Sequence, residues 1–348
     1  MEIEGEIQYD PNGIARAIIR GETDSYPVAI DADLQRSWCS CAKYVFSNKS
    51  CKHIIYLLDN VDYSKMVDMT NKLSRLETGS TILDNLLGGG IPYGSVTTTF
   101  GEPQSGKSVF GLQAGLANIA KTGKDTILIE TEGMREEDLK SLLYKFMGRF
   151  NLTKEIVDEK FKIYFTLGDP ELQSVQKLLM MFGIFLTLEI SKNGKYSTKF
   201  QFCAPTIKEK TMENVSLIIL DSLTKPIKDS IGSETQNLPS RSQIVERLFG
   251  KLYHTAKLYN LGVIVSHHAS IDPTMPFGRD LGKPYGGNPI LYNSKYAMEF
   301  IDATNKVKEE TGFGLEARRV KLLRRPDEPS TGELIPIRLK KDFGFCDS

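Results

Sequence analysis

The chain has 348 residues, of which 40% are hydrophobic and 25% charged, and its formal net charge is zero. This composition is typical of a soluble globular protein. It excludes attraction of the whole chain to nucleic acid, so any such contact must come from a local patch. The acidic start, MEIEGEIQYD, lacks the apolar core of a signal peptide, and the longest apolar run, Leu178–Leu188, is too short to span a bilayer and indicates a buried segment. We therefore predict a cytoplasmic protein with no membrane segment.

The first predicted elements surround a cluster of metal-binding residue types. Two strands, over 14–21 and 26–33, are joined by a short turn, and the segment CKHIIYLLDN predicts a helix with apolar residues at Ile54, Ile55, Leu57 and Leu58. Between the strands and the helix lies WCSCAKYVFSNKSCKH, with three of the five cysteines. Its pattern, C-x-C, nine residues and C-x-H, offers the ligands of a closed structural zinc site, which a small ββα unit needs for stability. The predicted Zn²⁺ ligands are Cys39, Cys41, Cys51 and His53.

This spacing resembles that of the SWIM zinc-finger family, whose signature is C-x-C, a variable gap and C-x-H. The resemblance covers residues 13–60, and all four ligand positions match. It implies a module that binds DNA or a protein partner. A closed set of four ligands leaves no open position for a catalytic water. We predict a SWIM-like module over 1–60, a partly helical linker over 61–77 and a second domain over 78–348.

The second domain opens with a phosphate-binding motif. GEPQSGKS fits G-x-x-x-x-G-K-[ST], with a predicted strand over 95–100 before it and a predicted helix over 108–120 after it. Glycines let the loop point its backbone N–H groups at phosphates, and the helix N-terminus favours anions. Lys107 is predicted to reach the β- and γ-phosphates of ATP, and Ser108 to ligate Mg²⁺. The predicted nucleotide-contacting loop residues are Gly101, Glu102, Pro103, Gln104, Ser105, Gly106, Lys107, Ser108 and Val109.

Two acidic residues follow later apolar strands. VSLIILDS is a continuous apolar run that ends in Asp221, as a buried parallel strand would, and Asp221 is predicted to hold Mg²⁺. TILIE predicts another strand, and Glu132 lies just past its carboxyl end, where ligands bind in open α/β sheets. A carboxylate there is placed to activate a water molecule.

The order of these motifs resembles the RecA-like recombinase core, and within it the archaeal RadA and RadB group. The resemblance covers residues 74–345 and depends on TGSTILDNLLGGGIPYGS, GEPQSGKS, ETEG, LIILDS, LGVIVSHHAS and PYGGNPILYNSKYAMEF. It implies an α/β fold with a twisted, mostly parallel sheet and an ATPase active in DNA repair or recombination. By the same resemblance Glu132 is the catalytic glutamate, and Arg135 lies against adenine. His268 stands where the family has a glutamine that senses the γ-phosphate.

The resemblance also implies partners. Two DNA-binding loops are expected, over 228–241, with Arg241 near its end, and over 270–288, with Arg279 and Lys283 as its cations. Single-stranded DNA is the expected ligand. A recombinase partner and homo-oligomerisation are also expected, since ATP lies between subunits in this family.

Several features depart from the family pattern. The Phe-x-x-Ala tether and the helix-hairpin-helix domain were not found, and residues 187–202, with an Asn-Gly turn, predict an inserted β-hairpin. These departures favour a recombinase paralogue that acts as a mediator or regulator. Three alternatives remain open: a KaiC-like signalling ATPase, a replicative-helicase motor, and a scaffold that binds ATP with little hydrolysis.

Overall fold

The computed structural model describes most of the chain, including the whole of the predicted phosphate site and all four predicted zinc ligands. The described residues are 1–9, 14–31, 37–41, 43, 51–62, 75–167, 174–232, 235–269, 284, 288–326 and 332–347. Residues 63–74 of the predicted linker and most of the loop at 270–288 fall outside these ranges. Within them, no helix is long and apolar enough to cross a membrane.

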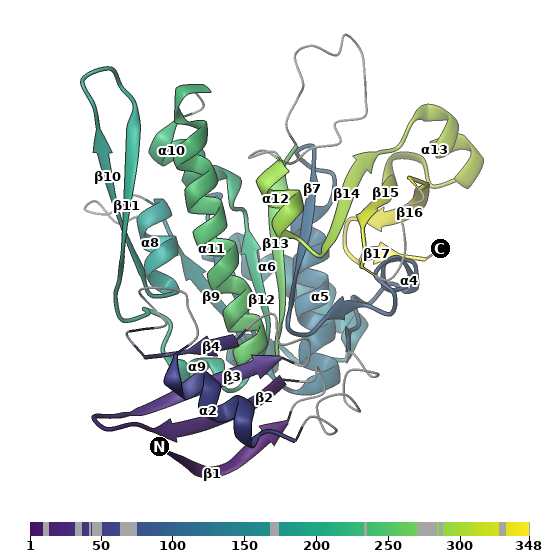
Figure 1. Ribbon diagram of the computed structural model, residues 1–348. Coiled ribbons are helices and arrows are strands. Elements are labelled where there is room, and N and C mark those ends of the chain that lie inside the picture. Colours follow the sequence, from purple (N-terminus) through teal and green to yellow (C-terminus); the bar gives the residue numbers. More distant parts are fainter. Residues whose placement is uncertain are drawn as a thin grey trace.

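The N-terminal region folds as an antiparallel sheet with one helix packed on it (Figure 1). The sheet order is β1-β2-β3-β4, with strands β1 (Glu2–Tyr9), β2 (Ile14–Arg20), β3 (Ser25–Asp31) and β4 (Ser37–Cys39). The predicted strands correspond to β2 and β3, and the predicted ββα unit lacked the two outer strands. Helix α2 (Lys52–Asn60) buries Ile54 and Leu57 against the sheet, as predicted. The prediction for Ile55 was wrong, because its side chain points outward and is 51% exposed.

The rest of the chain is built on a nine-stranded sheet of order β17-β16-β15-β14-β7-β13-β12-β8-β9. The six strands from β14 to β9 are parallel, and β15, β16 and β17 follow as a meander in which each strand pairs antiparallel with the one before it. The predicted α/β fold with a mostly parallel sheet is therefore confirmed. The strands are β7 (Ser95–Gly101), β8 (Asp125–Glu130), β9 (Phe161–Phe165), β12 (Val215–Asp221), β13 (Gly262–His268), β14 (Tyr296–Asp302), β15 (Ala317–Arg324), β16 (Leu334–Lys340) and β17 (Gly344–Cys346). A short ribbon of β5 (Arg75–Leu76) and β6 (Ile91–Pro92) lies beside them.

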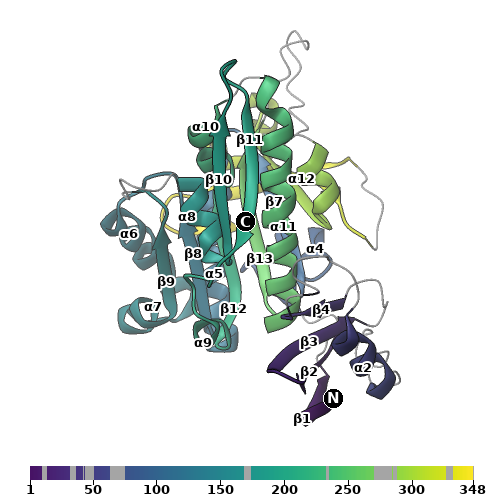
Figure 2. The same cartoon turned by 60° about the vertical axis from the view of Figure 1, so that its left-hand side comes forward.

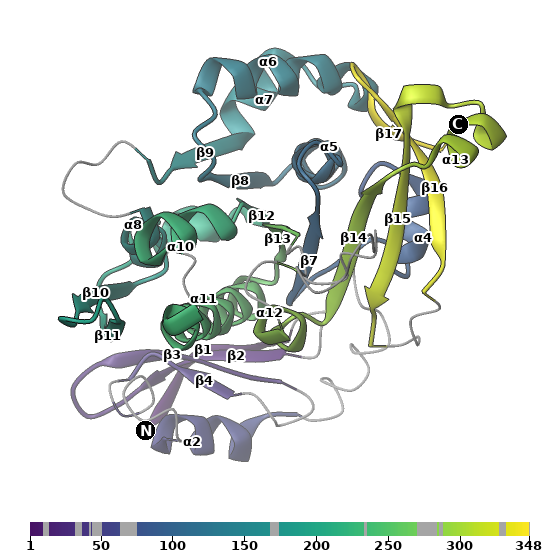
Figure 3. The same cartoon turned by 90° about the horizontal axis from the view of Figure 1, so that it is seen from above.

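Helices cover both faces of this sheet, as Figure 3 shows from above. On one face lie α5 (Lys107–Thr122), α6 (Glu136–Met147) and α7 (Lys154–Lys160). The other face carries α8 (Ser174–Met181), α10 (Thr224–Ile231), α11 (Leu238–Tyr259) and α12 (Asn288–Asn293). Each face has its own large hydrophobic cluster, because the parallel strands are apolar on both sides. The shorter helices are α4 (Thr81–Leu86), η1 (Gly148–Phe150), α9 (Glu209–Met212), η2 (Thr235–Asn237), α13 (Asn305–Thr311) and η3 (Gly314–Glu316).

A separate hairpin stands beside α11. Strands β10 (Ile184–Ile190) and β11 (Tyr196–Phe202) pair antiparallel, and Asn193 and Gly194 lie in the connecting turn. The apolar run Leu178–Leu188 is therefore divided between the end of α8 and the start of β10. Leu186 is fully buried and Ile184 nearly so, in the cluster on the α11 face of the large sheet, which attaches the hairpin to the core.

The N-terminal sheet lies beside the carboxyl end of α11 (Figures 1 and 2). The guanidinium of Arg16, on β2, donates a hydrogen bond to the backbone carbonyl of Lys257 near that helix end. Cations are favoured at helix C-termini, where carbonyl groups have no partner within the helix. The same helix begins at the opposite side of the molecule, beside the hairpin, so it connects the two regions.

Candidate active site and metal centre

The phosphate loop joins β7 to α5 and has a backbone that requires glycine at two positions. Gly101 has φ +154°, and an added Cβ would lie 2.1 Å from the carbonyl oxygen of Phe300. Gly106 has φ +107°, and its added Cβ would lie 2.5 Å from Cζ of Phe345. Side chains are excluded at both positions by conformation and by contact. The tip of the loop, Glu102 to Gln104, is exposed, while Ser105 is buried beneath it.

Lys107 lies across this loop with only 8% of its surface exposed. Its ammonium donates to the carbonyl oxygens of Gly101 (3.1 Å) and Glu102 (2.7 Å). Burial lowers the pKa of Lys107, and the negative charges of Asp221, Glu132 and Glu102 oppose that shift. The lysine is therefore close to the two carboxylates that the sequence analysis placed in the same site.

Asp221 lies at the carboxyl end of β12, between two neighbouring strands. Its side chain accepts a hydrogen bond from the hydroxyl of Ser266 on β13, and its backbone carbonyl accepts one from the amide of Thr131 (2.9 Å). Thr131 also donates from its hydroxyl to the carbonyl of Ser222 (2.6 Å). These contacts tie the ends of β8, β12 and β13 together, so the predicted Mg²⁺ ligand is held in a fixed position.

Glu132 and His268 are in direct contact. His268 Nε2 lies 3.1 Å from Glu132 Oε1, and the hydroxyl of Ser222 donates to the same carboxylate. Burial acts to raise the pKa of Glu132, but the hydrogen bonds from His268 and Ser222 outweigh it, so this pKa lies below its usual value. The backbone amide of His268 donates to the hydroxyl of Thr224 (2.9 Å), at the start of α10. Glu132 is therefore held ionised, as a general base must be.

Sequence reasoning missed Glu130, whose carboxylate holds the backbone of Glu132 in place. Glu130 is 3% exposed, and its carboxylate accepts hydrogen bonds from the amides of Glu132 (2.7 Å) and Gly133 (3.0 Å). Burial raises the pKa of Glu130, and these amide donors oppose that rise. The signal was an acidic residue as the last member of an otherwise apolar strand, which costs free energy unless it is hydrogen-bonded. The supporting hydroxyls of Ser222 and Ser266 were also missed.

Arg135 lies outside this group of contacts. It is the N-cap residue of α6, its side chain is 76% exposed, and it forms a two-point ion pair with Asp138 (2.8 and 3.0 Å). The hydrogen bond with Asp138 raises the pKa of Arg135. This geometry does not test the predicted contact between Arg135 and adenine, which stays a prediction.

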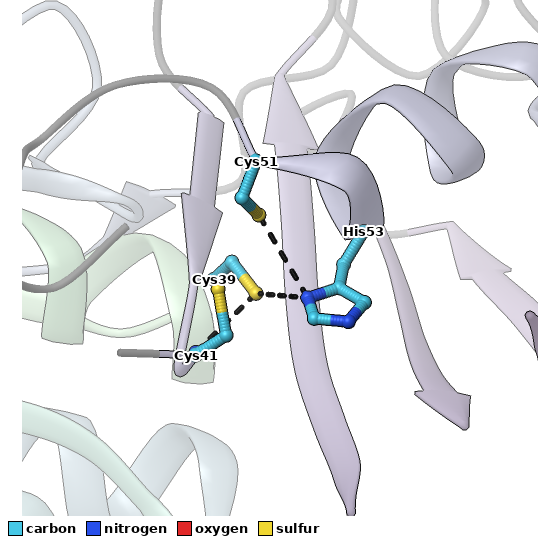
Figure 4. Close-up of side chains that lie close together, drawn as sticks. All are labelled: Cys39, Cys41, Cys51 and His53. Atoms are coloured by element: carbon cyan, nitrogen blue, oxygen red, sulfur yellow. Dashed lines mark hydrogen bonds between the residues drawn. The ribbon is translucent and has the colours of Figure 1, made fainter. Parts of the chain in front are cut away.

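The cysteines and histidine of the N-terminal cluster converge on one point (Figure 4). Cys39 ends β4, Cys41 follows it, Cys51 is the N-cap residue of α2, and His53 lies in the first turn of that helix. All four side chains are buried, and their ligand atoms lie within 4.8 Å of one another. His53 Nδ1 lies 3.6 Å from Cys39 Sγ and 3.9 Å from Cys51 Sγ.

These distances allow a test of the fit to zinc. Zinc–sulfur bonds of about 2.3 Å and zinc–nitrogen bonds of about 2.0 Å place tetrahedral S and N ligands about 3.5 Å apart. The observed separations of 3.6 and 3.9 Å agree with that geometry. Burial raises the pKa of the Cys39 thiol and lowers that of His53, so a bound cation would favour the thiolate of Cys39 and the neutral imidazole that zinc binds. The donor set is compatible with structural zinc.

The two predicted DNA loops have different outcomes. In the first, residues 228–231 end α10, residues 235–237 form η2, and residues from 238 onward begin α11. Arg241 is 6% exposed within α11, so its side chain is buried in this structure. The cations predicted for the second loop, Arg279 and Lys283, lie outside the described residues.

The fold and the phosphate loop define this chain as a RecA-like P-loop ATPase-type protein. A family model described as the KaiC ATPase matches residues 76–177, which contain the phosphate loop and Glu132. This match covers under a third of the chain and concerns that domain alone.

Longer similarities identify the family. The DNA repair and recombination protein RadB of Methanoculleus marisnigri is 44% identical over 224 residues, which cover 64% of this chain and 82% of that protein. RadB of Methanococcoides burtonii is 27% identical over 248 residues, which cover 71% of this chain and 87% of that protein. A crystal structure of the RadB recombinase has the same fold, with a TM-score of 0.55 at 21% identity, over 78% of this chain and 99% of that one. The chain belongs to the RadA/RadB family of DNA repair and recombination proteins.

Proposed function

We propose that this protein hydrolyses ATP with Mg²⁺ and acts on DNA as a mediator or regulator of recombination or repair. One observation supports this most strongly. Four groups come together at the carboxyl ends of four adjacent parallel strands: the phosphate-loop lysine, two carboxylates and a histidine. Ligands bind at the carboxyl ends of the strands in open α/β proteins.

Each group has a chemical role in the proposal. The loop amides and Lys107 bind the phosphates, and the hydroxyl of Ser108 and the carboxylate of Asp221 hold Mg²⁺. The metal supplies Lewis-acid stabilisation of charge on the phosphoryl oxygens. Glu132 orients a water molecule and accepts its proton as the water attacks the γ-phosphorus, which gives ADP and inorganic phosphate. Arg135 contacts the adenine.

His268 is the proposed link between ATP and DNA. It is bonded to Glu132 through its side chain and to Thr224 through its backbone. Thr224 begins α10, which leads into the loop at 228–241. A γ-phosphate oxygen that competes with Glu132 for the side chain of His268 would therefore alter the contacts at the start of α10. The loop at 270–288 follows His268 directly in the sequence and is proposed as the second DNA contact.

The N-terminal residues 1–60 are proposed as a zinc-stabilised docking module. Its position at the end of α11 places it away from the ATP site, so it would recruit DNA or a recombinase partner and take no part in hydrolysis. Homo-oligomerisation is proposed because the ATPase family places nucleotides between subunits.

The test is ATP hydrolysis by the zinc-loaded, full-length protein, with and without single-stranded DNA. Stimulation by DNA is the expected result. Hydrolysis indifferent to DNA would remove the proposed coupling and favour a signalling ATPase of the KaiC type. If the unmodified protein binds ATP but hydrolyses it no faster than a Glu132→Gln variant does, the scaffold alternative is favoured.

A further inference from the structure

The hairpin β10–β11 lies directly against the first predicted DNA loop. The backbone amide of Tyr196 donates to Oδ1 of Asn237 (3.1 Å), and the hydroxyl of Ser240 donates to the carbonyl of Tyr196 (2.7 Å). A Cβ added to Gly194 would lie 3.6 Å from the side-chain nitrogen of Gln236. In Figure 1 the hairpin tip projects on the same side of the molecule as α10. The hairpin therefore packs directly against residues 236–240, of which Gln236, Leu238 and Pro239 are exposed.

The tip is a turn of fixed geometry. The amide of Ser191 donates to the carbonyl of Lys195 (2.9 Å), and the amide of Lys195 donates back to the hydroxyl of Ser191 (3.1 Å). Gly194 has φ +74° and donates its amide to the carbonyl of Ser191 (2.9 Å). The side chains of Lys192 and Lys195 are both exposed on this turn. Their backbone positions are set before any ligand arrives, which lowers the entropic cost of binding.

Among the described residues around the tip, cations are in excess. The described acids Glu189 and Asp229 are already in ion pairs, with Lys199 (2.6 Å) and Lys225 (3.2 Å) respectively. The exposed residues Lys192, Lys195 and Lys228 form no ion pair within the part of the chain that the structure describes. A polyanion is the partner that complements such a surface.

Apolar groups accompany these cations. Ile190 is 63% exposed and pairs in register with the half-buried Tyr196, and Leu238 is 47% exposed at the start of α11. Single-stranded nucleic acid offers both phosphates and unstacked bases, and proteins bind it with cations and apolar or aromatic surfaces together. A duplex keeps its bases paired and stacked, so their faces are not open to these apolar side chains.

We propose that the hairpin tip, residues 190–196, is a further contact element for single-stranded DNA, with Lys192 and Lys195 binding its phosphates beside the loop at 228–241. The proposal rests on the proposed association with DNA. It adds an element that lies outside both of the loops implied by the recombinase resemblance.

The experiment compares two charge-reversed variants of the full-length, zinc-loaded protein. Lys192→Glu/Lys195→Glu removes the tip cations. Lys208→Glu/Lys210→Glu is the matched control, since both lysines are exposed, one as the N-cap residue of α9 and the other within that helix, beyond the far end of β11. Binding to fluorescein-labelled oligothymidylate is measured by anisotropy over a series of salt concentrations. Each lost phosphate contact lowers the slope of log affinity against log salt by about 0.7 for single strands, so the tip variant should be shallower by about 1.4.

The outcomes separate the two proposals. Weaker binding with a shallower slope in the tip variant alone supports the hairpin contact. Equal binding by all three proteins overturns it and leaves the DNA association intact, as does a weaker tip variant whose salt slope is unchanged. Failure of the unmodified protein to bind the oligonucleotide overturns both proposals. DNA-free ATP hydrolysis and Tm should be unchanged in the tip variant, and Lys192→Gln/Lys195→Gln replaces it if reversal disturbs the fold.

Discussion

The metal cluster and the phosphate site are both built where a strand is followed by the N-terminus of a helix, but they differ in how they are closed. In the cluster, the four side chains are buried, and their ligand atoms lie within 4.8 Å of one another. In the phosphate site, the groups come from the ends of separate strands, and the loop tip is exposed. A closed set of donors suits a structural metal ion, while an open site at the carboxyl ends of the strands suits a reactant that binds and leaves.

The N-terminal region and the ATPase domain also differ in the size of their hydrophobic cores. The N-terminal sheet and α2 share one small cluster, in which three of the buried members are the cysteines themselves. The ATPase sheet has a large cluster on each face. Units as small as the N-terminal region seldom gain enough from burial to fold unaided. We therefore expect the metal to stabilise the first region and to matter little to the second.

The largest expected effect is loss of the metal. Cys51→Ser should remove zinc and unfold the N-terminal region, because zinc binding to a structural site supplies about 10 kcal/mol of apparent free energy near neutral pH. DNA-free ATP hydrolysis should be retained. The measurements are zinc content by mass spectrometry and limited proteolysis of the first sixty residues. Cys203→Ser, which changes a half-buried thiol outside the cluster, is the control, and a full zinc content in Cys51→Ser would contradict the assignment.

Lys107→Ala tests the open site in the same way. Removal of its ammonium should lower kcat for ATP hydrolysis by about 10²–10³-fold, the usual loss for one group that stabilises transition-state charge. Tm should change little, because the hydrogen bonds that are lost join the lysine only to its own phosphate loop. Lys121→Ala, on the exposed end of the same helix, should keep full activity. Turnover retained in Lys107→Ala would remove the phosphate-site assignment.

The cluster and the site also differ in how far a sequence could predict them. The predicted zinc ligands fall within fifteen consecutive residues, at the end of one strand and the start of the next described helix, so spacing alone predicted the cluster. Glu132, Asp221 and His268 are far apart in sequence, and only the strand order β7-β13-β12-β8 makes them neighbours. Resemblance to a known family assigned these residues to one site, but no order of the strands was predicted. Composition and periodicity could not have supplied that order, because they report local structure and give no pairing of strands.

The contacts that no pattern predicted are those made by buried polar groups. Glu130, Ser222 and Ser266 support the site through hydrogen bonds whose partners lie on other strands. The strands β1 and β4 were missed for a related reason. β1 alternates glutamate with small or apolar residues and pairs irregularly near Gly5, and β4 has only three residues. Such segments gain their structure from the neighbouring strand, so local propensity is a weak guide to them.

Gly21 allows a finer test of the closed site. An added Cβ there would lie 2.9 Å from the ring of Tyr26 and 3.1 Å from His53 Nε2, and Tyr26 stacks on His53 with ring centroids 4.5 Å apart. Gly21→Ala should therefore displace the imidazole and weaken zinc binding about tenfold, as changes behind a metal ligand typically do. Competition with a chromophoric chelator measures this. Gly148→Ala, whose Cβ would meet nothing, should leave zinc affinity unchanged, and equal affinities in both variants would contradict the prediction.

His268→Ala tests the contact that holds the catalytic carboxylate. Loss of the hydrogen bond should raise the pKa of Glu132 toward its usual value, so the acidic limb of the pH profile of kcat/KM should move to higher pH. Because the folded-state pKa is depressed, this contact adds stability above the ordinary glutamate pKa and loses it as the pH falls through the lower value. At neutral pH, kcat should fall about two- to tenfold, the worth of one hydrogen bond. His268→Gln restores a donor and should recover both, and an acidic limb identical in His268→Ala and the unmodified protein would show that the contact does not tune Glu132.

The smallest expected effect concerns Arg135, a predicted nucleotide contact whose side chain is 76% exposed. Its ion pair with Asp138 is screened by water, so Arg135→Ala should leave Tm unchanged. If the guanidinium lies against adenine, as the family resemblance implies, its removal should raise KM for ATP roughly two- to fivefold with kcat unchanged. Asp138→Ala separates the two roles, because it releases the arginine without removing it. An equal rise in KM in both variants would mean that the ion pair shapes the start of α6, whereas a rise in Arg135→Ala alone would assign the base contact to the arginine. An exposed side chain such as that of Arg135 suits the open phosphate site, which a nucleotide enters and leaves. In the closed cluster, by contrast, all four predicted ligands are buried.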